Sequence, residues 1–220
     1  MLVNARTSKE DGLGQVLSWI ANFVAKPNAS LGRQGAVCPF LPRALKSDSL
    51  FFHELKLDTK LGDDQIDELI KTFADVFANT LPNVGKSRLN KAIVLVFPNL
   101  TDELAVKLIE ETQHRLKPFF VGRGLMLGEF HENHQGEGIR NDKFRPLQSP
   151  VPLLVIRHLI PSDLLFLVRK SDSAARRVHF LQSFLNVLSS SLSEEIRKEA
   201  SSALIEALSE LEQVRQEIAI

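Results

Sequence analysis

The chain has 220 residues, and its 27 Lys and Arg balance 27 Asp and Glu, so the formal net charge is zero. Nucleic-acid-coating proteins concentrate cations, so this balance predicts no nucleic-acid partner. Hydrophobic residues make up 44% of the chain, as in folded domains, and no apolar run approaches the roughly 20 residues of a membrane helix, which predicts no membrane partner. The polar stretch Met1–Glu10 predicts no signal peptide, and the single cysteine, Cys38, fits a cytoplasmic location.

The first part of the chain predicts a helix, a loop and a strand. Apolar residues recur at helical spacing over 12–26, and a proline ends that pattern. The stretch 27–35 is rich in turn-forming residues and is typical of a loop. Cys38 is interpreted as a small buried hydrophobe, with a thiolate ligand or nucleophile as the alternative. The two prolines that follow it exclude a regular helix interior. Alternation over 50–57 predicts a strand with His53 on its apolar side, as a core histidine; a histidine that lines a pocket or binds a metal is the alternative.

The central part predicts helices and strands in alternation. A stripe of apolar residues predicts a helix over 63–81, and a continuous β-branched run predicts a buried strand over 92–97. Thr101 is the expected N-cap of a helix that runs to about Leu116 and stops before a proline. The remaining expected elements are strands over 124–131 and 152–159 and a helical turn over 161–168.

This order predicts an α/β (α+β) fold, in which helices flank a mixed sheet of about four strands. The expected parts are an N-terminal helix and loop over 1–34, a core domain over 35–170 and a C-terminal helical extension over 171–220.

The C-terminal extension contains a heptad pattern. Its apolar positions are separated by steps of four or three residues, which we interpret as a coiled-coil seam; they are Leu192, Ile196, Ala200, Ala203, Ala207, Leu211, Val214 and Ile218. One interpretation is an amphipathic helix packed on its own domain. The other is a homodimer formed through the C-terminal helices.

The segment 122–141 holds the residues with the clearest chemical potential. If its first part is extended, Glu129 and His131 point to the same side, and the glycine-rich loop that follows can deliver His134 and Arg140. We interpret Glu129, Arg140 and Asn141 as candidate catalytic residues. The two histidines with Glu129 could form a two-histidine-one-carboxylate iron site, whereas a solvated surface loop is the alternative.

Arginines near the next strand are candidate anion-binding groups. Arg157 interrupts an apolar run, so it should pair either with a structural carboxylate such as Asp163 or with an anionic group of a ligand. Sequence signatures of dinucleotide-binding, P-loop and α/β-hydrolase proteins do not occur in the chain.

Two segments resemble an uncharacterised bacterial family. The run MLGEFHENHQGEGIRNDKFRPLQSPVPLLVIRHLIPSDLLFL at 126–167 and the run AVCPFLPRAL at 36–45 carry the resemblance. Members of that family are catalogued as a domain of unknown function, often near genes for specialised-metabolite assembly.

The order of landmarks is also similar to the small bacterial haem-dependent amino-acid N-hydroxylases of the YqcI/YcgG type. These landmarks are the cysteine-proline pair at Cys38, the strands over 50–57 and 92–97, and the late Phe130-His131 pair. The resemblance implies haem as cofactor, with His131 as the iron ligand and with Arg145 and Arg157 as candidates for the propionates or a substrate carboxylate.

Two functions follow as hypotheses. The first is a haem-dependent oxygenase that acts on an amino acid or a related small molecule in specialised metabolism. The second is a non-catalytic accessory protein of a biosynthetic assembly that uses its C-terminal helices as the contact surface.

Overall fold

The computed structural model describes residues 12–218, with the side chains of Lys86 and Ile218 excepted. The expectation about a signal in Met1–Glu10 therefore lies outside the described residues. The chain forms two compact units. The first holds the chain up to Leu116 together with Leu127–Arg157, and the second holds Lys117–Met126 together with the chain from His158 onward.

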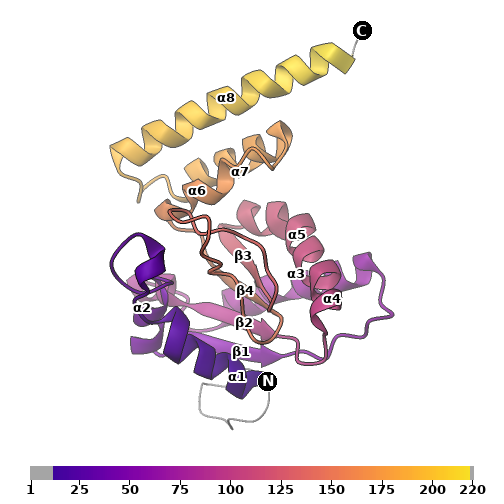
Figure 1. Ribbon diagram of the computed structural model, residues 1–220. Helices are drawn as coiled ribbons and strands as arrows, with labels where there is room; N and C mark the ends of the chain where they lie inside the picture. The colour runs from indigo at the N-terminus through magenta and orange to yellow at the C-terminus, as the bar shows by residue number, and fades with distance from the viewer. Residues whose placement is uncertain (1–11, 219–220) are drawn as a thin grey trace. The chain divides into compact units, whose positions relative to one another are not determined.

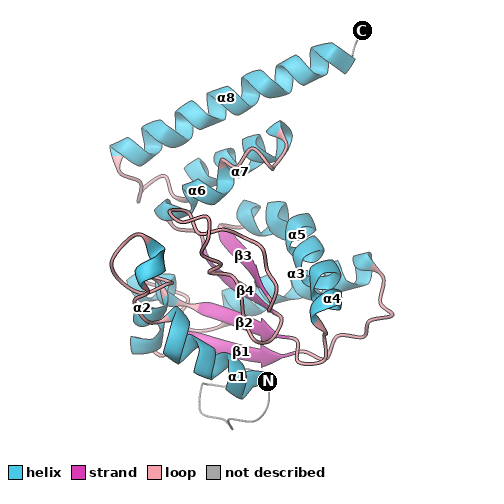
Figure 2. Ribbon diagram, viewed as in Figure 1, coloured by secondary structure: helices cyan, strands magenta, loops and turns pink. Residues whose placement is uncertain are grey.

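A four-stranded mixed sheet confirms the predicted fold class (Figures 1 and 2). Its strands are β1 (Leu50–Glu54), β2 (Ala92–Val96), β3 (Leu125–Phe130) and β4 (Leu153–His158), arranged in the order β1-β2-β4-β3. Strand β1 pairs with β2 in parallel, as a helical crossover between them requires, and β2 pairs with β4 in antiparallel fashion.

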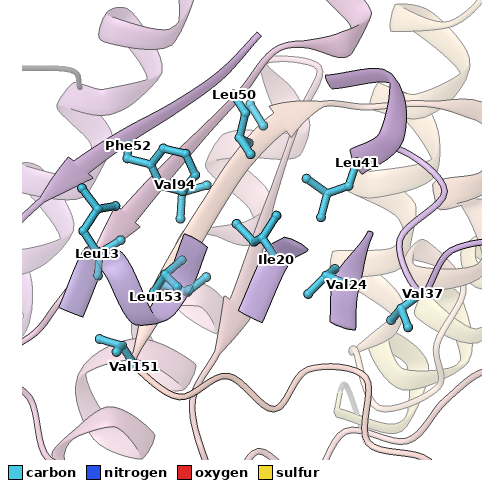
Figure 3. Packing of buried hydrophobic residues seen from close by; sticks show 13 residues of the cluster. Leu13, Ile20, Val24, Val37, Leu41, Leu50, Phe52, Val94, Val151 and Leu153 are labelled. Carbon is cyan, nitrogen blue, oxygen red and sulfur yellow. The ribbon is translucent and has the colours of Figure 1, made fainter. Parts of the chain in front are cut away.

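The N-terminal helix packs on one face of the sheet. It begins as α1 (Gly12–Trp19) and continues as a π-helical segment, η1 (Ile20–Val24). Figure 3 shows its apolar side chains beside those of three strands, and the buried cluster consists mainly of Leu13, Val16, Ile20, Val24, Leu50, Phe52, Ala92, Val94, Val96 and Leu153. Every second residue of the strands contributes, because side chains alternate between the two faces of a sheet.

Helix α3 (Asp63–Asn79) covers part of the opposite face. The ring of His53, which alternates with buried Phe52 on β1, lies 5.1 Å from the ring of Phe73 on α3. The five residues of β2 are at most 2% exposed, so both faces of this central strand are covered. His53 is therefore a histidine that packs against the core, as predicted.

The helix after β2 is longer than predicted. It runs without interruption through α4 (Asp102–Ala105), the π-helical segment η4 (Val106–Glu110) and α5 (Glu111–Gly122), and Pro118 lies inside α5. An interior proline costs a helix about 3 kcal/mol. Phe120 and Val121, which follow it, are completely buried, and burial of two large apolar side chains offsets a cost of that size.

A short helix that was not predicted follows Cys38. Helix α2 (Leu41–Lys46) contains Pro42 in its first turn, where a missing N–H breaks no hydrogen bond within the helix. The expectation that prolines exclude a helix interior in this segment is consistent with this position, because Pro42 lies at a helix start. The loops also hold two 3₁₀ turns, η2 (Ala29–Leu31) and η3 (Lys86–Asn90).

The second unit is built around helices α7 (Ala174–Val187) and α8 (Glu194–Ile218), which follow the short η5 (Pro161–Asp163) and α6 (Leu164–Leu167). Much of the heptad seam packs inside this unit. Ala200 and Ala207 are completely buried in one cluster with the apolar side of α7, whereas Val214 is 46% exposed. The first part of the seam is therefore buried against α7 of the same chain, and the homodimer remains a prediction.

Within the described residues, none of the helices combines the length and the apolar composition that crossing a membrane would require.

Candidate metal centre

Strand β3 and the turn after it bring two histidines to one side of the first unit. Phe130 points into the cluster under α1, so Glu129 and His131 point to the other side of the strand, as predicted. The chain then turns back, and the backbone N–H of His134 donates to the carbonyl of His131 across 3.3 Å. Both imidazoles are buried, and their ring centroids lie 5.2 Å apart.

The helix that begins at Asp102 supplies the carboxylates. Each residue of an α-helix turns the chain by about 100°, so a residue eight positions after Asp102 would lie about 80° around the helix. The π-helical segment η4 inserts one extra residue into its turn, which returns Glu110 to the face that carries Asp102. Both carboxylates consequently meet the same imidazole, that of His131.

The His131 ring lies between these two carboxylates. Its Nδ1 is 2.9 Å from Oδ1 of Asp102, and its Nε2 is 2.6 Å from Oε1 of Glu110. Only 1% of the residue is exposed. This burial excludes the alternative of a histidine in a solvated loop.

Asp102 is held as a hydrogen-bond acceptor on the Nδ1 side. It also accepts the backbone N–H of Asn133, across 3.2 Å, and the side-chain amide of the same residue. Burial raises the pKa of Asp102, but the hydrogen bonds from His131 and Asn133 outweigh this effect and hold the pKa below its ordinary value. When an ion is bound to Nε2, an ionised Asp102 would accept the N–H of Nδ1 and so orient the imidazole toward the ion.

His134 completes the cluster. Its Nε2 lies 3.5 Å from Oε1 of Glu129 and 3.9 Å from Oε1 of Glu110. Its Nδ1 accepts the backbone N–H of Gly136 across 2.9 Å. A Cβ on Gly136 would lie only 2.7 Å from Cε1 of His134, so this position requires glycine for the ring to lie where it does.

The donor set fits one divalent transition-metal ion. One donor atom each from Glu110, His131 and His134 all lie within 4.8 Å of one another. Ligand atoms that bind one ion at about 2.0–2.2 Å are separated by about 3 Å, and the distances of 2.6 and 3.9 Å from Glu110 to the two histidines bracket this value. Two imidazoles and a carboxylate suit Fe²⁺ or Zn²⁺, and Asp102 would be the outer carboxylate that orients His131.

The surroundings of His131 fit a macrocycle poorly. An iron-bound haem would have to occupy the space in which the carboxylate of Glu110 contacts Nε2, and the ring of His134 lies only 5.2 Å from that of His131. The nearby carboxylates would also repel anionic propionates. The geometry therefore favours a single ion over haem at this imidazole.

The other residues predicted from the sequence lie elsewhere in the first unit. The side-chain amide of Asn141 donates to the carbonyl of Ser30 across 2.8 Å. Arg140 lies against Gly32, and Arg145 donates to the carbonyl of Asp142 and pairs with Glu137. Each of these contacts joins loop to loop.

Arg157 is half-buried rather than fully buried in β4, opposite Ala92 of β2. Among the candidates from the sequence, the structure thus brings together Glu129, His131 and His134. It adds Asp102 and Glu110, which the sequence analysis missed.

Residues 13–199 match the family described as Domain of unknown function (DUF6875). Since this range covers most of the chain, the chain belongs to that family, which confirms the predicted membership of a family without an established function. No curated protein and no solved structure matches the chain.

Proposed function

We propose that this member of the DUF6875 family is a mononuclear, non-haem metal-dependent enzyme. Its ion would be held by His131, His134 and Glu110. The observation that carries the proposal is the convergence of these three donor atoms within 4.8 Å, on two histidines that are almost inaccessible to solvent. A two-histidine-one-carboxylate set leaves coordination positions open for a substrate or for oxygen.

Iron and an oxygenase reaction on a small molecule are the preferred assignment. The donor set is the one used by non-haem iron oxygenases, and the resemblance to amino-acid N-hydroxylases implies oxygen chemistry as well. The cofactor would then be a bare iron ion in place of the haem that the resemblance implies. A role in specialised metabolism, a cytoplasmic location and an amino acid or related small molecule as the substrate remain predictions.

The residues around the ion would have different roles. A bound ferrous ion would supply the activation of oxygen. Asp102 holds the proton and the orientation of His131, and Glu129 lies where it can accept or release a proton beside His134. Both imidazoles are buried, whereas the side chain of Glu110 is 38% exposed, so the site would be reached from the side of this carboxylate.

Metal titration tests the proposal. Chelator-treated protein is titrated anaerobically with Fe²⁺ in a calorimeter, and His131→Ala, His134→Ala and Glu110→Ala are compared with His114→Ala, whose exposed histidine lies outside the site. We expect one ion per chain in the wild type and in the control, and loss of at least tenfold in affinity in each site variant. Equal affinity in all four variants would place the ion elsewhere.

Haem is tested in the same preparation. A stoichiometric Soret band after addition of hemin, lost in His131→Ala, would replace the proposal by the haem-dependent oxygenase. Metal affinity for Zn²⁺ but not for Fe²⁺ would retain the site and overturn the oxygenase assignment.

A specific observation also favours the second candidate, an accessory protein that binds a partner or a second copy through its C-terminal helices. Helix α8 exposes large apolar side chains, with Ile205 65%, Leu208 43% and Val214 46% exposed. Co-purification of a biosynthetic partner that is lost when Ile205 and Leu208 are both changed to Lys would support this function. Retention of the partner would exclude this face of the helix.

A further inference from the structure

A second candidate site lies on the first unit around the only tryptophan of the chain, Trp19. Two surface hollows share Trp19 and Pro150 in their walls. The larger, of ≈ 480 Å³, is lined by Gly14, Gln15, Ser18, Trp19, Asn22 and Pro150. The smaller, of ≈ 210 Å³, is lined by Trp19, Glu132, Gln148, Ser149 and Pro150. We call the two together the Trp19 hollow.

The lining has a distinctive chemistry. It combines one large aromatic ring with one carboxylate, that of Glu132, and with several neutral amide and hydroxyl groups. Lysine and arginine are absent from the residues that line it. An anionic ligand would therefore meet repulsion and no compensating cation, whereas a cationic ligand would meet both a carboxylate and an aromatic ring.

Trp19 is held in place by other rings. The ring of Phe130 approaches it edge-on, with centroids 5.8 Å apart, and the ring of Phe23 stacks at 6.4 Å. An aromatic surface fixed in this way loses little conformational entropy when a ligand binds. Trp19 is only half-buried, so part of the side chain stays accessible.

We propose that the Trp19 hollow binds an organic ammonium ion, with the cation over the indole ring and Glu132 as its counter-ion. Tryptophan is the strongest cation–π partner among the side chains. The neutral amide and hydroxyl groups beside the ring accept hydrogen bonds from an ammonium or from a polar substituent on the ligand.

This site is separate from the metal centre. Phe130, which supports Trp19, and His131 point to opposite sides of the strand end. The two sites are neighbours along the chain, since Glu132 follows His131 and the N–H of Ser149 donates to the carbonyl of His131 across 3.1 Å. The side-chain amide of Gln148 also donates to the carbonyl of His134 across 3.5 Å, but none of these contacts uses an imidazole or Glu110. The proposal therefore does not depend on the ion.

Fluorescence offers a direct test, because the chain has one tryptophan and no tyrosine. Metal-free protein is titrated with choline and with butylammonium, and the uncharged counterparts dimethylbutanol and pentanol serve as ligand controls. We expect a saturable change in Trp19 emission with at least one ammonium ion, and affinity about tenfold weaker for its neutral counterpart.

Two variants test whether ammonium binding depends on the carboxylate of Glu132. Glu132→Gln should weaken ammonium binding by about tenfold, whereas Glu54→Gln, at an exposed acid on β1 outside the hollow, should not. Circular dichroism checks that both variants fold. Absence of a saturable response to both ammonium ions, equal binding of the neutral counterparts, or equal binding by Glu132→Gln would each overturn the proposal. Since no metal is present, none of these outcomes bears on the metal centre.

Discussion

At the residue scale, the central feature is one buried imidazole with a carboxylate on each nitrogen. Buried polar groups need partners, and His131 meets Asp102 through Nδ1 and Glu110 through Nε2. The two contacts have different consequences. Asn133 also donates to Asp102 and so holds the carboxylate that contacts Nδ1. The contact between Nε2 and Glu110 is the one that an ion bound to both atoms would replace.

The role of Asp102 as a positioning residue can be measured. Asp102→Asn keeps the shape of the side chain but removes the charge that holds the proton of His131 on Nδ1. We expect metal affinity to fall by about 10- to 100-fold while one ion per chain still binds at saturation. Calorimetric titration with Fe²⁺ measures both quantities. An unchanged affinity would show that Asp102 has only a structural role at the start of α4.

The position of His134 depends on the lack of a side chain at Gly136. In Gly136→Ala the new Cβ would lie 2.7 Å from Cε1 of His134 and 3.0 Å from Cδ1 of Leu147. The imidazole must then shift, so we expect weaker metal binding without loss of folding. Gly62→Ala is the matched control, because the nearest atom there is 3.9 Å away. Equal metal affinity in the two variants would contradict a ligand role for His134.

At the scale of elements, helix α3 ends on a buried cation. The ammonium of Lys91 donates to the carbonyls of Phe77 and Thr80 and lies 4.4 Å from the centroid of the Phe77 ring. Burial lowers the pKa of Lys91, and the nearby charge of Arg88 lowers it further. The two carbonyls belong to the negative end of the helix, which a cation stabilises.

Removal of this charge should destabilise the protein. Lys91→Met keeps the length of the side chain but leaves both carbonyls without their donor, so we expect the free energy of unfolding to fall by about 1–3 kcal/mol. Urea denaturation measures the difference. Lys56→Met, at an exposed lysine after β1, should change stability much less. Comparable stability of the two variants would contradict this account of the α3 terminus.

The predicted homodimer can be tested with variants on the exposed apolar side of helix α8. Ile205 is 65% exposed and Leu208 is 43% exposed, whereas the buried alanines of the same helix pack inside their own unit. If the C-terminal helices also join two chains, the double variant Ile205→Lys/Leu208→Lys should convert a dimer into a monomer that still folds. Light scattering after size exclusion gives the mass. A wild-type monomer would refute the homodimer outright.

The fold was largely predictable from the sequence, but the metal centre was only partly so. The spacing of apolar residues and the positions of proline and glycine predicted the strands and the long helices. Apolar residues repeat every two residues in a strand and every 3.6 residues in a helix, because these are the residues that face the core. These patterns also placed Glu129 and His131 on one side of a strand. The partner Glu110 could not be predicted, because its direction depends on the π-helical segment η4, and an inserted residue leaves no clear mark in an apolar pattern.

At the scale of the whole molecule, the second unit contains a buried network of charged side chains. In the second unit, Asp172 accepts from Lys117 across 2.7 Å and from Arg176 across 2.9 Å, and both Lys117 and Asp172 are buried. Burial raises the pKa of Asp172, but the bonds and charges of Lys117 and then Arg176 outweigh it and lower the pKa. Burial lowers the pKa of Lys117 despite the opposing effect of Asp172. The attraction between Asp172 and its two cations therefore keeps the carboxylate ionised, although burial of the charged groups is itself unfavourable.

Acid should weaken this network in a defined pH range. The carboxyl of an Asp in the unfolded chain has a pKa of about 3.9, which is higher than the pKa of Asp172 in the folded protein. The stabilisation is thus complete above about pH 4 and is lost as the pH falls through the folded pKa. We expect Asp172→Asn to lower the free energy of unfolding by about 3 kcal/mol at neutral pH, with a difference that shrinks in acid.

Denaturant unfolding at several pH values checks this prediction. Glu199→Gln, at an exposed carboxylate on α8, is the control and should follow the wild type throughout. A difference between Asp172→Asn and the wild type that stays constant down to low pH would contradict the role given to the charge of Asp172.

The central claim is that one metal ion binds at His131, and anomalous X-ray scattering tests it most directly. Crystals of the chain grown with Fe²⁺ under anaerobic conditions are measured on both sides of the iron absorption edge. The account predicts one strong anomalous peak per chain, about 2.0–2.2 Å from Nε2 of His131 and within bonding distance of Glu110 and His134. A fully loaded crystal without a peak at this imidazole, or with the iron inside a haem, would contradict it.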